Sequence, residues 1–308
     1  MNETSSISSE QLRARHHRLS QKDKAGYLML LPSLIIFVFF VFFPVIYSAF
    51  MSLHDWSLSS QVTPFIGFLN YLNILKDDEF WNSLKNTLIY TVGVVSGGLI
   101  LSLLLAVALN ANIKGKTLLR AIFYMPSIAS MVIISIIWTF MLDPNLGIVA
   151  TITNSLHIHP ISLLNNPNLA MPTLICVAIW KNIGYYAVIF LAGLQGIPDM
   201  LYEAAMIDGA NNRKQFLHIT LPMLSPTILF VLTILTINSF QVFDQVYVMT
   251  QGGPLHTTDT LVSYIFDKAF TSFNLGYASA LSYVLFILTF GLSLLQFRSF
   301  GFFKSQEN

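Results

Sequence analysis

The 308-residue chain is too apolar and too weakly charged to cover the surface of a water-soluble globular protein. Charged residues make up 10% of it and hydrophobic residues 54%, whereas roughly a quarter of a soluble domain is charged. The net charge of +1 gives no basic surface, which excludes nucleic acid as a default partner, and a single cysteine excludes an internal disulfide.

Six long apolar runs follow one another along the chain. They are residues 27–50, 86–109, 121–142, 169–192, 222–243 and 276–297. About 20 helical residues cross a hydrocarbon core, so each run is long enough to span a bilayer. The first run is too long for the apolar part of a signal peptide, which is about 7–15 residues. Since Lys181 is the only charged residue in any run, we expect an all-α integral membrane protein with six transmembrane helices.

The distribution of lysine and arginine predicts the orientation of these helices. Positive residues concentrate in the cytoplasmic segments of membrane proteins. One side would hold Arg13, Arg15, Arg18, Lys22, Lys24, Lys114, Lys116, Arg120, Arg213, Lys214, Arg298 and Lys304, and the other only Lys76, Lys85 and Lys268. Both termini are therefore predicted to be cytoplasmic, with basic tails at residues 1–26 and 298–308 and the transmembrane domain at 27–297. The acidic residues Asp77, Asp78 and Glu79 fall on the predicted outer side. They are interpreted as a helix start, as a solvated surface or as a docking patch.

No motif in the chain predicts catalysis or metal binding. Gly115-Lys116-Thr117 ends like a phosphate-binding loop, but Asn110 stands where that motif needs a glycine and no strand precedes it. His157 and His159 have no third ligand nearby in sequence. Cys176 is expected to be a small core residue. We predict no catalytic residue, no metal ligand and no cofactor held by this chain.

The predicted cytoplasmic loop at residues 193–221 is the most informative segment. Pro198-Asp199 is a helix-start signal, and Gly209 suits the left-handed conformation that ends many helices. This predicts a short helix to about Asp208 and a second from Asn211 toward Ile219, with Pro222 in the first turn of the fifth span. Met200, Glu203, Ala204 and Ile207 would share one face. From spacing alone, that face fits equally a docking surface for another protein and an amphipathic helix at the membrane interface.

The loop resembles the EAA loop of permease subunits of binding-protein-dependent ABC importers, in the branch that carries sugars and glycerol phosphate. The matching positions are Glu203, Ala204, Ala205, Asp208, Gly209, Ala210, Phe216, Ile219, Leu221 and Pro222. Further similar segments are Phe68-Leu69-Asn70-Tyr71, Arg120 to Pro126, Gln241 to Tyr247, Gly252-Gly253-Pro254 and Gly276 to Ala280. The resemblance covers about residues 28–298. Unlike the maltose-type relative with extra spans and a large external insertion, this chain is similar to the simpler six-span members.

The resemblance implies the type I importer permease fold and a division of labour among subunits. It implies a second homologous permease, two ATPase subunits that bind ATP and Mg²⁺, and an extracytoplasmic solute-binding protein, in the cytoplasmic membrane of a bacterium or archaeon. The ten matching loop residues would dock in a cleft of the ATPase. The implied cargo is a sugar or oligosaccharide, with a non-sugar solute such as glycerol phosphate as an alternative. A second alternative is an ion-driven secondary transporter, although no internal repeat supports it. An intramembrane enzyme is disfavoured because acid, base and metal constellations are missing.

Polar residues within the predicted spans are candidates for the solute pathway because such groups are expensive in lipid. These candidates are Asn238, Gln241, Lys181, Asn182, Tyr185 and Asp244. Amide, hydroxyl and aromatic side chains are suited to sugars. For each residue taken singly, the alternative is a polar contact that joins helices to one another or to a second permease.

Overall fold

The computed structural model describes residues 21–57, 62–111, 114–155 and 162–300, with side chains from Leu28 onward. Within these ranges all regular elements are helical, and two isolated bridges, His54 with Phe65 and Ser57 with Asn274, are the only β pairing. The predicted all-α fold is therefore confirmed for this part of the chain. His157, His159 and most of both predicted tails lie outside it. The chain divides into two compact units, Met1–Met51 and Ser52–Asn308.

In the first unit, the residues that the structure describes form one continuous helical run. It comprises α2 (Gln21–Phe37), the π-helical turn η1 (Val38–Phe42) and α3 (Phe43–Ser52). Pro44 has no N–H and so cannot donate to the preceding turn, and the wider π turn lies directly before it. The stretch Leu28–Ser52 is long and apolar enough to cross a membrane, as predicted for the first span.

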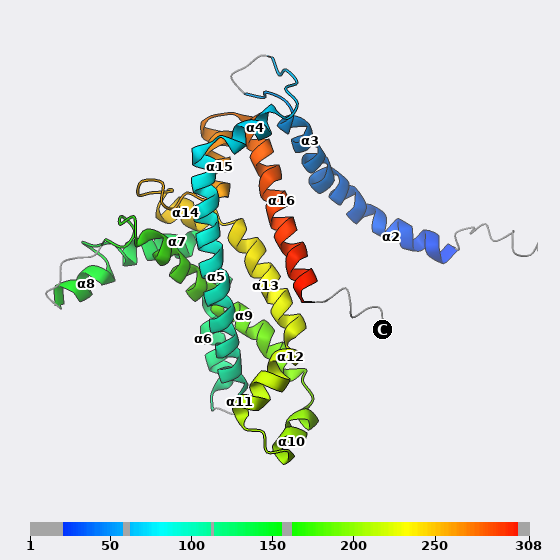
Figure 1. The fold of residues 1–308 in the computed structure, drawn as a ribbon, viewed down its shortest axis with the longest axis vertical. Coiled ribbons are helices and arrows are strands. Elements are labelled where there is room, and N and C mark those ends of the chain that lie inside the picture. The colour runs from blue at the N-terminus through cyan, green and yellow to red at the C-terminus, as the bar shows by residue number, and fades with distance from the viewer. Residues whose placement is uncertain (1–20, 58–61, 112–113, 156–161, 301–308) are drawn as a thin grey trace, which may run out of the picture. The chain divides into compact units, whose positions relative to one another are not determined.

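The second unit contains the remaining helices. They are α4 (Leu69–Leu75), α5 (Asp78–Asn110), α6 (Lys116–Ile128), α7 (Met131–Met141), α8 (Ile148–Ser155), α9 (Ala170–Gln195), α10 (Asp199–Ile207), α11 (Asn212–Gln215), η2 (Phe216–Thr220), α12 (Leu221–Met223), α13 (Ser225–Phe240), α14 (Asp244–Met249), α15 (Leu261–Phe266), η3 (Asp267–Thr271) and α16 (Leu275–Ser299). Figure 1 shows α4 and α15 at one end of this unit, beside the start of α5, and α10 to α12 at the other. The first is the predicted outer end and the second the predicted cytoplasmic end.

Close packing of α5 on α9 forms the centre of the unit. Gly93 and Gly97 of α5 let Ile175 and Ile179 of α9 approach its backbone. Small residues at such an interface let membrane helices pack closely, where dispersion rather than hydrophobic burial holds them together. Helix α5 starts eight residues ahead of the predicted span because Asp77 caps it, accepting hydrogen bonds from the N–H groups of the first turn.

The third predicted span, residues 121–142, is not one continuous helix. Helices α6 and α7 meet at a bend of 96°, with Ala129 and Ser130 in extended conformation between them. Pro126 weakens the last turn of α6 because it cannot donate to the carbonyl of Ile122. The predicted apolar segment is therefore a bent pair of helices, either a broken span or a re-entrant segment.

The fifth predicted span, residues 222–243, is also bent. The segment Asn212–Met223 makes an angle of 66° with α13, and Leu224 lies between them. Pro226 cannot donate to the carbonyl of Pro222, which removes the hydrogen bond that would keep the helix straight. Pro222 therefore lies in the segment before the bend, and Pro226 is the proline in the first turn of the apolar helix. Among the residues that the structure describes, four helices are long and apolar enough to span a membrane, or up to six if each bent pair is one span.

Candidate functional site

Helix α10 begins and ends where the sequence predicts. Gly209, just past its end, has φ +75°, a left-handed conformation that suits glycine. The N–H of Ala210 donates to the carbonyl of Ala205 at 2.8 Å, and the N–H of Gly209 to that of Met206 at 3.1 Å. These two bonds form a Schellman motif, which satisfies the last carbonyls of the helix. The glycine thus gives α10 a sharp end and turns the chain toward α11.

The motif residues of the predicted coupling segment differ in exposure. Glu203, Ala204, Asp208, Gly209 and Pro222 are exposed, whereas Ala205, Ala210, Phe216, Ile219 and Leu221 are half-buried. No residue of α10 is buried, and its apolar side chains Met200 and Ile207 are 70% and 87% exposed. The predicted face of Met200, Glu203, Ala204 and Ile207 is therefore exposed along its whole length.

Two contacts anchor this exposed helix to the rest of the unit. On one side, Ile197 lies in the hydrophobic core just after α9. On the other, the hydroxyl of Tyr202 is 2.9 Å from that of Thr220, which is buried in η2. The side chain of Asn211 caps α11 by accepting from the N–H of Lys214 at 2.9 Å. These contacts tie α10 to both the α9 end and the α13 end of the loop.

The predicted pathway residues fall into two groups. Asn238, Gln241 and Asp244 are exposed near the end of α13 and the start of α14. By contrast, Asn182 donates to the carbonyl of Ala178 in its own helix, at 3.1 Å. Asn238 has one weak contact, 3.4 Å from its amide nitrogen to the hydroxyl of Tyr186. Asn238, Gln241 and Asp244 thus present exposed polar groups around the end of α13, and Tyr185 is also exposed, on α9.

The aromatic and basic candidates on α9 lie against the bend between α6 and α7. The ring of Tyr185 is tilted against that of Tyr124 of α6, with centroids 6.5 Å apart. Lys181 is 9% exposed, and its Nζ donates to the carbonyl of Ser127, in the last turn of α6, at 3.5 Å. The carbonyls of a last turn have no partner within the helix and attract positive charge. No acidic side chain forms an ion pair with Lys181 in the described part of the chain.

Hydrogen bonds between distant segments, which the sequence did not predict, hold the outer end together. The buried amide of Gln245 accepts from the Tyr90 hydroxyl at 2.8 Å and donates to the carbonyl of Leu174 at 2.7 Å. The side chains of Asn82 and Asn86, on α5, donate to the carbonyl of His256 at 2.8 and 3.0 Å. Their partners lie up to 174 residues away, so no local pattern could reveal them.

Asp77 is the centre of one such cluster. Its carboxylate accepts from the hydroxyls of Tyr264 and Tyr277 and from the N–H groups of Glu79 and Phe80. Partial burial alone raises the pKa of Asp77, but these four hydrogen bonds outweigh it and hold the pKa below its usual value. The stability that this ionised group contributes is thus complete at neutral pH and is lost in acid, as the pH falls through the lowered pKa.

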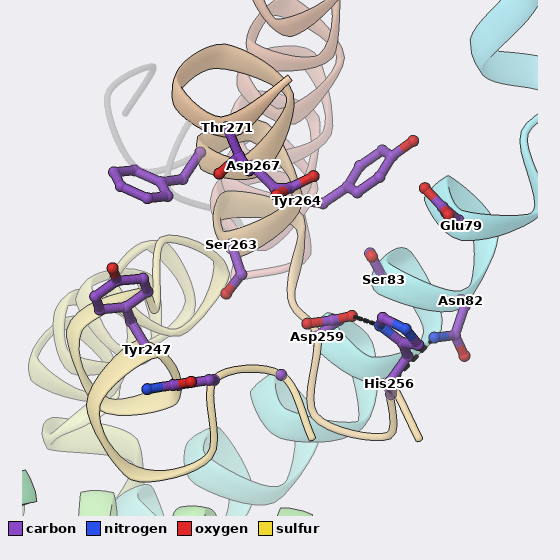
Figure 2. Close-up of a pocket in the computed structure, with 13 residues that line it drawn as sticks. Glu79, Asn82, Ser83, Tyr247, His256, Asp259, Ser263, Tyr264, Asp267 and Thr271 are labelled. Carbon is purple, nitrogen blue, oxygen red and sulfur yellow. Dashed lines mark hydrogen bonds and ion pairs between the residues drawn. The ribbon is translucent and has the colours of Figure 1, made fainter. Parts of the chain in front are cut away.

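A cavity of about 380 Å³ opens next to this cluster at the predicted outer end. Figure 2 shows Tyr247 on one side of it, Glu79, Asn82 and Ser83 of α5 on the opposite side, and Asp259 with His256 below. The lining residues are Glu79, Asn82, Ser83, Tyr247, Gln251, Gly252, His256, Asp259, Ser263, Tyr264, Phe266, Asp267 and Thr271. Polar and aromatic side chains thus share one concave surface.

The described residues contain no group of histidine, cysteine and acidic side chains that could hold a metal ion. Gly115 has φ +78° and caps α6, so the residues that resemble a phosphate-binding loop form an ordinary helix start.

Cys176 is exposed on α9, which corrects its predicted place in the core. Arg120 is half-buried, and its guanidinium donates to the carbonyl of Leu109 at the end of α5 at 3.3 Å.

Comparison with known families matches residues 98–299 to the model described as "Binding-protein-dependent transport system inner membrane component". The chain is 36% identical to the trehalose/maltose transport system permease protein MalF of Thermococcus litoralis, over 89% of this chain and 92% of that protein. It is also 36% identical to the sn-glycerol-3-phosphate transport system permease protein UgpA of Agrobacterium fabrum, over 88% and 93%. The multiple sugar-binding transport system permease protein MsmF of Streptococcus mutans is 34% identical, over 89% and 94%.

A solved structure shares the fold over nearly the whole chain. It is that of a bacterial ABC transporter involved in the import of the acidic polysaccharide alginate, with a TM-score of 0.82 and 26% sequence identity. The alignment covers 91% of this chain and 96% of the matched chain. A second structure of this kind, a bacterial alginate ABC transporter in complex with a pentasaccharide-bound periplasmic protein, gives a TM-score of 0.79 at 25% identity.

Proposed function

Since this chain belongs to the inner-membrane components of binding-protein-dependent transport systems, as a permease subunit of an ABC importer, we propose that it carries a sugar or oligosaccharide across the cytoplasmic membrane. Subunits of this family are permeases and not enzymes, and a solute-binding protein is their partner. Sugar permeases among the relatives support the choice of cargo. ATP and Mg²⁺ would be bound by a separate ATPase.

We further propose that residues 199–221 couple the permease to this ATPase. The observation that carries this proposal is α10 itself, a short helix with no buried residue that two contacts anchor to the rest of the unit. Met200 and Ile207 leave apolar surface exposed beside the charged residues of this supported helix, and an exposed apolar patch with a polar rim is typical of a protein-protein interaction site. Glu203 and Asp208 add negative charges to the same surface, which suits basic residues on the ATPase.

The two contacts that anchor α10 explain how movement of the ATPase would reach the pathway. Movement of α10 pulls on α9 through Ile197 and on the bent α12–α13 segment through the Tyr202–Thr220 contact. Shifting a two-state equilibrium from 1:99 to 99:1 takes about 5.5 kcal/mol, which nucleotide binding can supply. The free polar groups Asn238, Gln241 and Asp244 would then face the solute between this chain and a second, homologous permease.

Reconstitution tests this function directly. Three preparations of proteoliposomes are compared. The first holds the chain alone, the second holds it with a second permease and the ATPase, and the third, the complete system, adds a solute-binding protein. We expect sugar uptake only in the complete system, with ATP inside the vesicles or on the ATPase side. Uptake by this chain alone, driven by an ion gradient, would support the alternative of a secondary transporter. Uptake of glycerol phosphate in place of sugar by the complete system would overturn the choice of cargo.

Replacing Lys181 by methionine is expected to leave the melting temperature of the assembled transporter unchanged or slightly higher, yet to reduce uptake severalfold. The reason is that a buried charge without an ion-pair partner is costly in the membrane, so the charge is retained for a role other than stability. Thermal unfolding and initial uptake rates measure the two effects separately. Lys181→Arg keeps the charge and should restore most of the uptake. Normal uptake by Lys181→Met would remove Lys181 from the pathway.

A further inference from the structure

The outer cavity has the mixture of side chains that recognises carbohydrates. Its volume of about 380 Å³ lies in the usual range for small-molecule sites, roughly 300–1,000 Å³. Amides, hydroxyls and carboxylates provide directed hydrogen bonds to sugar hydroxyls, and aromatic rings provide flat apolar faces. All of these line the cavity. The amides and hydroxyls are those of Asn82, Gln251, Ser83, Ser263 and Thr271, the carboxylates are those of Glu79, Asp259 and Asp267, and the aromatic rings are those of Tyr247, Tyr264 and Phe266.

Its aromatic wall is held in place by packing. The ring of Tyr247 stacks on Phe243, with centroids 5.2 Å apart, and meets the edge of Phe266 at 5.4 Å. Phe266 is in turn tilted against Phe270, at 4.9 Å. Tyr247 nevertheless remains 48% exposed, so part of its ring is free to contact a solute. A fixed and partly open aromatic ring of this kind is suited to the apolar face of a sugar.

The charges at the cavity are predominantly negative. Glu79, Asp259 and Asp267 line it, and Asp77 lies directly behind Tyr264 and Tyr277. The opposing positive groups are two. Lys268 pairs with Glu79 at 3.0 Å, and His256 pairs with Asp259 at 2.5 Å. Even with His256 protonated, which its hydrogen bond to Asp259 favours by raising its pKa, the carboxylates exceed the cations. Lys76, just after α4, and Lys85, on α5, are exposed but do not line the cavity.

Exposed polar residues lead from α13, the second half of the bent fifth span, toward this cavity. Asn238, Gln241, Asp244, Tyr247 and Gln251 follow one another at intervals of three or four residues, and all are exposed. The last two line the cavity itself. The polar groups proposed for the pathway therefore continue along the chain into the cavity wall.

We propose that this cavity is an outer subsite that receives an uncharged saccharide before it enters the pathway and that disfavours anionic solutes. The inference rests on the proposed function, which makes this the side where solute arrives, and it narrows the cargo to neutral sugars. An anion would meet Asp259 and Asp267 with no free cation to pair with among the described lining residues. A neutral sugar would meet the same carboxylates as hydrogen-bond acceptors.

Chemical modification of a cysteine in the cavity tests this proposal. The native cysteine is first removed by Cys176→Ala, and Ser263→Cys or Thr271→Cys is then introduced into the complete transporter in proteoliposomes. The second position guards against failure of the first to assemble. Each thiol is treated with a cationic and with an anionic methanethiosulfonate reagent. Leu146→Cys, at a position that is 90% exposed and predicted to be on the same outer side, gives the reference rates.

We expect the cationic reagent to react about tenfold faster than the anionic one at positions 263 and 271, relative to position 146, since negative potential concentrates cations in a cleft. Maltose, trehalose or sucrose should slow modification severalfold, and glycerol 3-phosphate should not. Equal rates for the two reagents would overturn the charge preference. Protection by none of the three sugars, or equal protection by glycerol 3-phosphate, would overturn the assignment to neutral saccharides.

ATP-dependent uptake, measured in the Cys176→Ala parent vesicles, separates this proposal from the proposed function. Protection of the cavity thiols without any uptake of sugar would leave the subsite standing and remove the transport function. ATP-dependent uptake of sugar, without protection of the cavity thiols by sugar, would support the transport function and overturn the subsite.

Discussion

Charge reversal at Glu203 is expected to abolish most uptake and solute-stimulated ATPase activity while the chain still assembles in the membrane. Glu203 is exposed on α10 and forms no ion pair within the described residues, so Glu203→Lys disturbs no internal contact. At a docked surface, however, a like charge facing basic residues costs several kcal/mol, and each 1.4 kcal/mol is tenfold in affinity. We therefore expect a loss of more than about tenfold in uptake, measured in proteoliposomes with the ATPase partner.

Lys116→Glu is the matched control for this variant. It reverses a charge at another exposed position on the predicted cytoplasmic side, in the first turn of α6, where a negative charge is compatible with the helix. This control should transport normally. If Glu203→Lys also transports normally, or if it is simply absent from the membrane fraction, the coupling role of α10 loses its support.

Replacing Gly184 by alanine is expected to destabilise the chain strongly. Gly184 is buried on α9, and a Cβ atom there would overlap the backbone carbonyl of Phe123 on α6. Neither backbone can move without opening the contact between α6 and α9, and overpacking of this kind typically costs 1–3 kcal/mol or more. We expect the melting temperature of the purified complex to fall by on the order of 5 °C or more.

Gly291→Ala provides the comparison because the chemical change is the same. Gly291 lies within α16, and a Cβ atom built there meets no other atom within 4 Å. Alanine favours a helix over glycine by roughly 0.5–1 kcal/mol, so this variant should melt at the same temperature or slightly higher. Equal melting temperatures for the two variants would contradict the close contact of α6 with α9.

Local signals in the sequence predicted the parts of the fold that depend on local physics. The start of α10 after Pro198 and its end at Gly209 were predicted correctly, because a proline start and a left-handed glycine stop act within a few residues. The apolar runs were located for a similar reason, since hydropathy summed over a window is insensitive to detail. Of the three interpretations of the outer acidic residues, the helix start is confirmed, because Asp77 caps α5.

The two bends could not be predicted in this way. Residues 121–142 are predominantly apolar, and hydropathy carries no information on the direction of the chain. Pro126 weakens one turn, but the position of the α6 end also depends on Lys181 and Gly184 of α9, which approach it only in the folded chain. The bend at Leu224 could have been suspected from the spacing of Pro222 and Pro226, because the second proline leaves the carbonyl of the first without a donor.

The outer cavity was missed because its residues come from distant segments. Asn82 and His256 both line it, and they contact each other across 174 positions of sequence. Of the predicted pathway residues, those on α13 and α14 stay candidates because Asn238, Gln241 and Asp244 are exposed. Asn182 instead donates a hydrogen bond to a carbonyl of its own helix. A polar residue in a membrane span can thus have a structural role in place of a contact with solute.

Cross-linking from the tip of α10 tests the central claim most directly. Ile207, 87% exposed, is replaced by cysteine in the Cys176→Ala chain, which is then co-expressed with its second permease and ATPase and treated with a bifunctional thiol reagent. We predict a covalent adduct with the ATPase whose yield changes between nucleotide-free and ATP-bound states. Leu146→Cys, at an exposed position that is predicted to lie on the outer side, should give none. Absence of an Ile207→Cys adduct in every nucleotide state of an assembled complex would contradict the account.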